Sequence, residues 1–448
     1  MNNKLIGIAL SGGGFRASFF HIGVLTQMAR QGILKYVDVI STVSGGSIIG
    51  AFYYLKLKKK IEDSSDVLSD EDYILLVKEI EEEFYNCVKK NIRKQIYFSW
   101  DLNFNFSSKL TKRLNEDFYY PLLLEKNINI SALKINPTKS NNKVPKLIIN
   151  ASCLNDGKIM KFIISDKDEE LIIDTNIGEA VAASACVPGL FNPVTINTGT
   201  RTISLVDGGV LDNLGIESLI EENCTEYMIS DGSGYFWNDS NPSSLLHKVI
   251  NRTQDVFMNN NYLNSLSKIS TTNYYHVYLR LNLTSTEQFL PSFYKFDFEQ
   301  TESTINNNIN NEVQHLLSEI RTDLDCFSEI EARSLMLSGF LLSNELIQKS
   351  SLSKRVTCFD HYEHEFSFMS LKEDIKNPND NYLRKLYIGG FRFFKISLLL
   401  FTYIFKFIRL FILLTQEFIE MIKYVSSINF KAKRNSYFIL FVSFFCEC

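Results

Sequence analysis

Residues 5–17, LIGIALSGGGFRA, decide the fold of this chain. The apolar run Leu5–Leu10 predicts a short buried strand, and the stretch from Ala17 onward predicts a helix. The three glycines Gly12–Gly14 therefore lie in a tight turn between a strand and a helix. Successive glycines let the backbone approach a ligand closely, and a helix N-terminus adds positive potential. Such a turn favours an anion or a developing oxyanion.

The same layout recurs about thirty residues later. Val37–Ile40 predicts a second strand, Ile48–Leu55 predicts a second helix, and the bend between them holds Ser44. A serine in a sharp turn between a strand and a helix is exposed for nucleophilic attack.

A third element places a carboxylate at a strand end. Arg201–Val206 predicts a strand, and Asp207-Gly208-Gly209 follows it directly. An aspartate before two glycines is by itself more often a turn than a catalytic group. Combined with Ser44, it offers a base that can take the proton of a serine hydroxyl.

Together the three elements resemble the patatin-like phospholipase family. The resemblance implies a three-layer αβα fold with a mainly parallel central sheet, and hydrolysis of lipid acyl esters by a serine–aspartate dyad without histidine, metal or cofactor. It assigns Ser44 as the nucleophile, Asp207 as the general base, and Gly12, Gly13 and Gly14 as the oxyanion hole.

The resemblance extends from about Leu5 to about Gly234. Phe19–Leu25 matches the family's helix behind the glycine turn, Asn150–Ile164 a strand pair, and Ala182–Phe191 a helix of small residues with a proline turn. Arg16 matches the family's arginine after the glycines. We expect it to bind a lipid phosphate or to support the oxyanion turn, with a salt bridge at the surface or between structural elements as the alternative.

Two departures from the family pattern keep other functions open. Thr42 stands where the nucleophile motif has glycine, and Ala17 replaces a glycine after Arg16. Because Thr42 crowds a sharp turn, a lipid-binding protein with a relic site is one alternative. A dinucleotide-binding oxidoreductase is a weaker one, because the glycine turn also fits a relaxed dinucleotide fingerprint with Asp38 as its acidic residue.

The histidines and cysteines provide no competing site. We expect His21 to be a packed, hydrogen-bonded core residue, and His361 and His364 to lie in a solvated turn instead of a metal site. The eight cysteines show no paired spacing, and Cys153 and Cys186 lie in apolar segments, as reduced thiols do. These features predict a cytoplasmic protein.

We expect residues 1–330 to form the catalytic domain, with residues 56–125 as a helical insertion and residues 331–380 as a connecting region. The insertion opens with Lys56–Lys60 and continues through an acidic run from Glu62 to Asp72, which together predict a charged surface loop. Ser69 and Asp72 then form a capping box ahead of an amphipathic helix whose apolar face includes Tyr73, Val77, Ile80 and Phe84.

Residues 381–448 differ from the rest of the chain in composition. They hold 13 of the 35 phenylalanines, and ten Lys or Arg against three Glu, a net charge of +7 in a chain whose total is −4. From Arg392 to Glu420 the polar residues share one side of a helical wheel, and the longest uncharged run, Ile396–Phe405, has ten residues. That is too short to span a bilayer, so we expect an amphipathic helix on an anionic membrane surface, not a nucleic-acid site.

Overall fold

The computed structural model describes residues 5–97, 105–123, 125–126, 128–135, 142–165, 173–199, 201–234, 240–270, 275–280, 309–349 and 365–390. The chain divides into two units, Met1–Phe391 and Arg392–Cys448, and every described residue lies in the first. The predicted membrane-binding helix from Arg392, as well as His361 and His364, lies outside the described residues.

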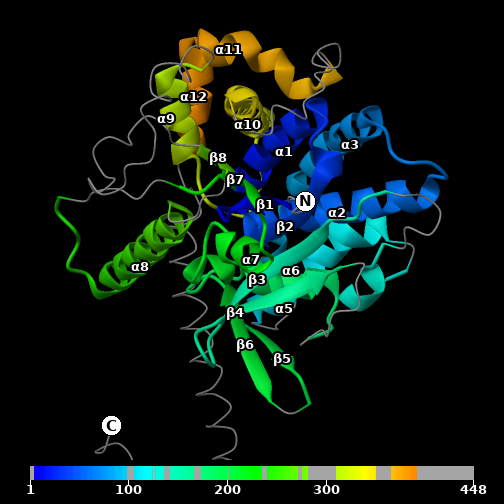
Figure 1. Cartoon of the computed structure of the whole chain (residues 1–448). Helices are drawn as coiled ribbons and strands as arrows, with labels where there is room; N and C mark the ends of the chain where they lie inside the picture. Colours follow the sequence, from blue (N-terminus) through cyan, green and yellow to red (C-terminus); the bar gives the residue numbers. More distant parts are fainter. Residues whose placement is uncertain are drawn as a thin grey trace, which may run out of the picture. The chain divides into compact units, whose positions relative to one another are not determined.

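One mixed sheet organises the described part of the chain (Figure 1). Its order is β5-β6-β3-β2-β1-β7-β8, with β4 also paired to β3. The parallel pairs join β2 to β1 and β3, and β7 to β1 and β8, whereas β4, β5 and β6 enter through antiparallel pairs. The strands are β1 (Ile6–Leu10), β2 (Val37–Val43), β3 (Lys146–Cys153), β4 (Ile159–Ile164), β5 (Val194–Asn197), β6 (Thr202–Asp207), β7 (Glu226–Asp231) and β8 (Tyr275–Arg280).

Helices cover both faces of the sheet. Ile6, Ile8 and Leu10 of β1 join the larger apolar core, together with α1 (Gly14–Arg30), α2 (Gly45–Asp63) and α6 (Ile177–Ala185). Ala9, between them in sequence, joins a second core with side chains of α7 (Ile216–Glu221) and α8 (Leu246–Ser270). Because alternate residues of a strand point to opposite faces, these two cores are the two sides of one sheet. The predicted three-layer αβα fold is confirmed.

The predicted insertion is helical and packs on the catalytic core. It contains α3 (Asp70–Lys89), α4 (Ile92–Tyr97), α5 (Phe106–Leu114), a π-helical turn Asn115–Tyr119 and a 3-10 turn Tyr120–Leu122, and a further 3-10 turn, Ile130–Leu133, follows it. The capping box of Ser69 and Asp72 is present, and Tyr73, Val77, Ile80 and Phe84 are buried, as predicted. Phe84 meets Phe15 and Phe19 of α1 edge to face, so α3 covers the helix that follows the glycine turn.

The loop predicted at Lys56–Lys60 was wrong, because these residues form the later turns of α2, which continues to Asp63. The physical reason lies on both sides of the helix. Leu57 and Ile61 are buried in the core, and Lys56 pairs with Glu79 and Glu83 of α3. The lysine run is therefore one charged side of an anchored helix.

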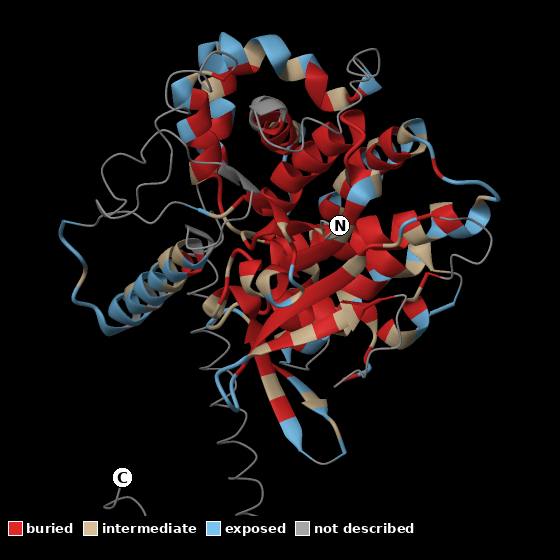
Figure 2. Cartoon of the chain, in the orientation of Figure 1, coloured by how far each residue is buried: buried red, intermediate tan, exposed pale blue. Residues whose placement is uncertain are grey.

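The C-terminal part of the described chain shares the same core. It contains α9 (Asn311–Glu319), α10 (Glu329–Lys349), a 3-10 turn Ser367–Leu371, α11 (Lys372–Lys376) and α12 (Asp380–Gly389). A Cβ on Gly23 of α1 would overlap the carbonyl oxygen of Met336, and one on Gly339 of α10 would overlap that of Phe20. The backbones of α1 and α10 thus touch, and Figure 2 shows α10 among the buried elements. The three-part division at residues 330 and 380 stays a prediction.

Two short 3-10 turns complete the described elements, Leu34–Tyr36 before β2 and Gly208–Val210 after β6. Among the described helices, none combines the length and apolarity needed to cross a membrane.

Candidate active site

The sheet register brings the three predicted motifs to one place. Leu10 at the end of β1 pairs with Thr42 near the end of β2, so the glycine turn and Ser44 leave the same edge of the sheet. Val43 pairs with Asn150 of β3, and the next residue of β3, Ala151, pairs with Asp207 at the end of β6. Strands that are far apart in sequence thus place Asp207 beside Ser44.

Ser44 occupies a strained turn. Its φ is 50° and its ψ is −116°, and among the described residues it is the one with positive φ that is neither glycine nor asparagine. Backbone strain of this kind costs about 1–3 kcal/mol and tends to cluster at functional sites. The turn is tight because the backbone of Gly45 lies against that of Gly14, where a Cβ on residue 45 would overlap the Gly14 carbonyl. Side chain 44 therefore projects from a bend held between two glycine-rich segments.

Asp207 is buried beside the candidate nucleophile. Burial raises the pKa of its carboxyl to about 6, against the opposing effect of hydrogen bonds from the Ser44 hydroxyl and the Gly209 amide. The Gly209 N–H donates to Asp207 Oδ1 at 2.8 Å. Burial disfavours a carboxylate and so increases its proton affinity. The pKa of Asp207 is therefore closer to neutral pH than the pKa of an exposed aspartate, and its carboxyl lies beside a serine hydroxyl.

The three glycines of the turn differ in what their amides do. The Gly12 N–H donates to the carbonyl of Asn213 at 3.0 Å, so it is not an open donor in this structure. The amides of Gly13 and Gly14, at the start of α1, donate to no other protein group within the described part of the chain. A Cβ on Gly12 would lie 3.3 Å from the Cβ of Ser44, so the turn passes directly beside the serine.

Thr42 fits into the turn without distorting it. Its hydroxyl donates to the carbonyl of Ile148 at 3.0 Å and accepts from Ser47 Oγ at 3.0 Å. Its methyl carbon Cγ2 points at Gly50, where a Cβ would lie only 2.5 Å away. The absence of a side chain at position 50 therefore makes the room that Thr42 needs.

Buried hydroxyls that the sequence analysis did not single out hold the turn from below. Ser184 Oγ accepts the Ser44 N–H at 2.9 Å, donates to the Asn150 carbonyl at 2.6 Å, and lies 2.8 Å from Ser47 Oγ. All four residues are buried. Ser184 lies in the small-residue helix that the resemblance had matched, but a serine among alanines gives no pattern that would reveal this contact.

Arg16 joins structural elements in this structure. The residue is 3% exposed, and its guanidinium donates to the carbonyls of Gly232 at 3.2 Å and Ile320 at 2.6 Å. These contacts tie the start of α1 to the ends of β7 and α9. They fit the inter-element role, with backbone carbonyls in place of a carboxylate, and phosphate binding by Arg16 stays a prediction.

His21 is a satisfied core histidine, as predicted. Its Nε2 lies 3.0 Å from the Ser11 carbonyl and its Nδ1 2.7 Å from Ser230 Oγ. Because a carbonyl only accepts, Nε2 carries the proton and Nδ1 accepts from the serine. Burial lowers the pKa of His21 to about 4, against the raising effects of the Ser11 hydrogen bond and of Asp231. The ring is therefore neutral near pH 7.

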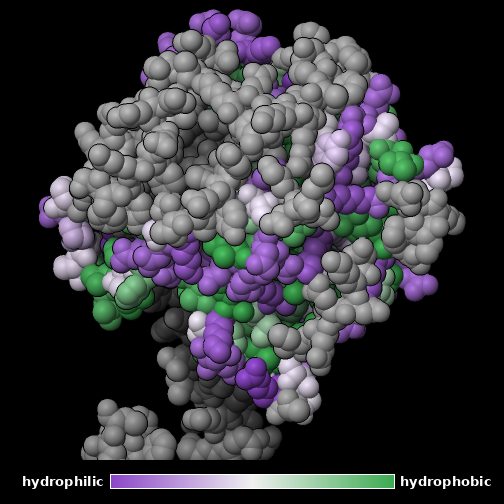
Figure 3. All heavy atoms as spheres, in the orientation of Figure 1, coloured by the Kyte–Doolittle hydropathy of each residue, from purple (hydrophilic) through white to green (hydrophobic). Residues whose placement is uncertain are grey.

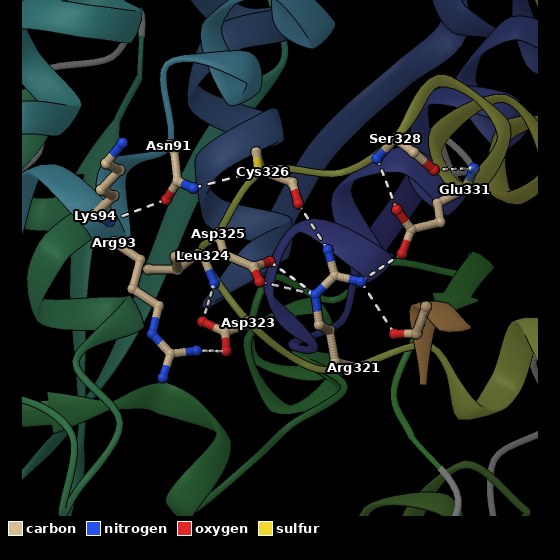
Figure 4. A network of polar contacts seen from close by, with 11 residues as sticks. Asn91, Arg93, Lys94, Arg321, Asp323, Leu324, Asp325, Cys326, Ser328 and Glu331 are labelled. Carbon is tan, nitrogen blue, oxygen red and sulfur yellow. Dashed lines mark hydrogen bonds and ion pairs between the residues drawn. The ribbon is translucent and has the colours of Figure 1, made fainter. Parts of the chain in front are cut away.

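A segment from the C-terminal half braces the glycine turn. The Asp323 carbonyl accepts the Phe15 N–H at 3.0 Å, and the Asp323 carboxylate pairs with Arg93 of α4 (Figure 4). The Leu324 carbonyl accepts the Arg93 N–H at 3.2 Å. The helical insertion and the segment between α9 and α10 are thereby joined at the start of α1.

Arg321 holds that segment in shape. Its Nε donates to both carboxylate oxygens of Asp325 at 2.8 and 2.9 Å, and its Nη2 donates to the Cys326 carbonyl at 2.6 Å (Figure 4). Its Nη1 contacts Glu331 of α10 and the Gly389 carbonyl of α12. We call the segment between α9 and α10 the brace. It connects the glycine turn to α9, which it directly follows, and to α10 and α12.

The dinucleotide interpretation finds no support in the geometry. Asp38 is the second residue of β2, at the opposite end of the strand from the glycine turn. Its Oδ2 accepts the Ile6 N–H at 2.8 Å, and its Oδ1 pairs with Lys143. A dinucleotide site needs its acidic residue at the carboxyl end of that strand.

In the described part of the chain, no group of three or more His, Cys, Asp or Glu side chains is arranged to hold a metal ion. The thiols of Cys153 and Cys186 are free and buried, as predicted.

A comparison with protein-family models agrees with this arrangement. Residues 8–220 match the family described as patatin-like phospholipase, a range that includes the glycine turn, Ser44 and Asp207. Among solved structures, the chain is similar to the crystal structure of VipD from Legionella pneumophila, at 13% identity and a TM-score of 0.36, over 96% of this chain and 81% of that one. No curated protein matches the chain. The structure and the family model therefore agree on a patatin-like phospholipase domain over residues 8–220.

Proposed function

We propose that this protein hydrolyses lipid acyl esters, as a phospholipase A-like enzyme, with Ser44 as nucleophile and Asp207 as general base. The observation that carries the proposal is that the sheet register places a serine in a strained turn beside a buried aspartate whose pKa is raised to about 6. The family of residues 8–220 supplies the substrate class, a lipid ester.

In the proposed first step, Asp207 takes the proton of the Ser44 hydroxyl as its oxygen attacks the ester carbonyl carbon. The carbonyl oxygen becomes an oxyanion, which the amides of Gly13 and Gly14 are placed to stabilise. Helices α1 and α2 both begin beside Ser44, and their N-termini add positive potential at this site. Collapse of the tetrahedral intermediate expels the alcohol, which takes the proton from Asp207.

The second step releases the fatty acid. Water attacks the acyl-serine carbonyl, Asp207 takes the water's proton, and the serine oxygen leaves and recovers a proton from Asp207. A buried carboxyl with a pKa of about 6 suits both directions, because it is ionised at neutral pH and gains a proton readily.

The partner that we propose is a membrane surface carrying the lipid. The basic, aromatic region 381–448 would bind anionic headgroups, which makes the protein peripherally membrane-associated. We propose no cofactor and no nucleic-acid partner. The relic-site alternative rested on Thr42, and Gly50 removes the steric basis for it.

The test is labelling of the purified protein by a fluorophosphonate, together with hydrolysis of a soluble ester. We expect the wild type to be labelled, and both labelling and hydrolysis to be lost in Ser44→Ala and Asp207→Asn. Exposed Ser65 and Asp156 supply matched controls, since Ser65→Ala and Asp156→Asn change the same residue types elsewhere. Hydrolysis retained in a folded Ser44→Ala protein would refute the dyad, and a wild type that is neither labelled nor active would favour the relic site.

A further inference from the structure

Helix α8 carries exposed apolar side chains along its N-terminal half. Leu246 is 75% exposed, Phe257 is 63% exposed and Ile250 is 58% exposed, and Leu245, Val249 and Val256 are also exposed. Figure 2 shows most of α8 exposed, and Figure 3 shows hydrophobic atoms gathered over its N-terminal end, on the left of the view. We call these six residues the α8 stripe.

The α8 stripe lies on one side of the helix. At about 100° per residue its six members fall within an arc of about 140°, with Thr253 in the middle of that arc. The residues that attach α8 to the rest of the protein lie in its C-terminal half: Asn261, Tyr262 and Ser265 form hydrogen bonds, Leu263 packs on the second core, and Lys268 pairs with Glu217 of α7. The stripe and the attachment sites therefore occupy different halves of the helix.

The attached half of α8 is fixed to the candidate active site. Asn261 Nδ2 donates to the Val210 carbonyl at 2.7 Å, three residues after Asp207. Ser265 donates to Asp212 at 3.2 Å, and the Tyr262 hydroxyl donates to Asp231 at 3.1 Å. The α8 stripe therefore stands in a defined position relative to the proposed general base.

We propose that the α8 stripe inserts into the surface of a lipid bilayer and presents the active site to it. This inference rests on the proposed function, because a lipid ester is reached only at a lipid surface. Exposed apolar side chains gathered on one helix face are typical of interaction sites. Lys248 and Arg252 fall along one edge of the stripe, where cations meet anionic headgroups. The stripe is separate from residues 381–448, so it is a second contact with the membrane.

The test uses the full chain and vesicles of phosphatidylcholine and phosphatidylglycerol. Leu246, Ile250 and Phe257 are replaced together by serine, and the control replaces Val67, Leu75 and Leu154, which are apolar residues exposed elsewhere on the protein. We expect the α8 variant to bind vesicles about 10- to 100-fold more weakly than the wild type. The control variant should bind like the wild type, and all three proteins should hydrolyse a soluble ester at one rate.

A second measurement reports contact directly. In Phe257→Trp, we expect vesicles with brominated acyl chains to quench more tryptophan fluorescence than in the wild type, and Leu154→Trp to show no added quenching. Equal vesicle binding by the α8 variant and the wild type, with no added quenching in Phe257→Trp, would overturn the inference. A wild-type dimer that dissociates in the α8 variant would overturn it in favour of a second copy of the chain as the occupant.

Failure of the proposed function is distinguishable from failure of the inference. If the wild type hydrolyses no ester but the α8 variant loses vesicle binding, the membrane contact stands and the enzyme activity does not. If ester hydrolysis is normal and the α8 variant binds vesicles unchanged, the activity stands and the membrane contact does not.

Discussion

The fit between Thr42 and Gly50 predicts a strong coupling between two positions in the nucleophile turn. In Gly50→Ala the added Cβ would lie 2.5 Å from Thr42 Cγ2, about 1 Å inside the usual carbon–carbon separation. Thr42 cannot rotate away, because a β-branched side chain is stiff and its hydroxyl is held by the Ile148 carbonyl and by Ser47. Something in the turn must therefore shift.

The magnitude follows from a double-mutant cycle with Thr42→Ser, which removes Cγ2 and keeps the hydroxyl. Overpacking costs about 1–3 kcal/mol. The gain of up to about 1 kcal/mol from alanine in a helix is the same in both backgrounds and cancels. We therefore expect Gly50→Ala to be less destabilising in the Thr42→Ser background by about 1–3 kcal/mol.

Equilibrium unfolding in urea measures the four free energies, and fluorophosphonate labelling reports the state of Ser44. Labelling should slow in Gly50→Ala and recover in the double variant, because the clash lies in the turn that positions the nucleophile. Thr26→Ser, which removes a buried threonine methyl group from α1, replaces Thr42→Ser in a control cycle. The free energies of Thr26→Ser and Gly50→Ala should add. Additive free energies for Gly50→Ala and Thr42→Ser, within about 0.5 kcal/mol, would refute the reasoning.

Three further predictions concern the dyad, the brace and the chain ends. The Asp207 pKa of about 6 lies above the ordinary 3.8, so the contribution of this carboxyl to the free energy of unfolding falls as pH rises from 3.8 to 6. Urea unfolding should therefore show Asp207→Asn to be more stable than the wild type at pH 8, by up to about 3 kcal/mol. Below pH 3.8 the variant should show no gain. Arg93→Ala should lower the free energy of unfolding by about 3–5 kcal/mol, because it leaves the Asp323 carboxylate without this ion pair. Replacing both partners, Arg93→Met with Asp323→Leu, should lower it by less. Equal losses in the two proteins would contradict the role of the pair. A chain ending at Phe391 should still hydrolyse a soluble ester but bind anionic vesicles more weakly. A chain ending at residue 308 should be inactive, because it lacks Asp323 and α10. Activity of that shorter chain would show that the contacts at Asp323 are dispensable.

The sequence was sufficient for the parts of the fold that local pattern determines. The two strand–turn–helix units, the strand ending at Asp207 and the capping box at Ser69 all depend on residues close together in the chain, and the structure has each of them. The end of α2 was missed because a lysine run is equally typical of a solvated loop. The contacts that anchor the run as helix, the burial of Leu57 and Ile61 and the pairing of Lys56 with α3, appear only in the folded structure.

The candidate site was predictable to the level of residue type but not of hydrogen bonding. Gly12 matches the oxyanion motif as well as Gly13 does, yet its amide is taken by a carbonyl two hundred residues away, at Asn213. Ser184 supports the Ser44 amide from a helix in which every neighbour is small and apolar. Contacts of this kind depend on three-dimensional register, and a single sequence does not contain a signal for them.

The contacts at Asp323 give a reason why the proposed catalytic unit would extend beyond the matched residues 8–220. An oxyanion donor works only if it is held in place before the reaction, because reorganisation during the step would consume the stabilisation it offers. A turn of three glycines has little rigidity of its own. In this chain the Asp323 carbonyl accepts a hydrogen bond from the amide of Phe15, the residue after Gly14. Arg93 and Arg321 hold the segment that contains Asp323. The acceptor is a backbone carbonyl, which any residue could supply, so the C-terminal half can fix the turn without leaving a motif. What the motif residues need from the rest of the chain is rigidity, and the ion pairs outside the motif supply it.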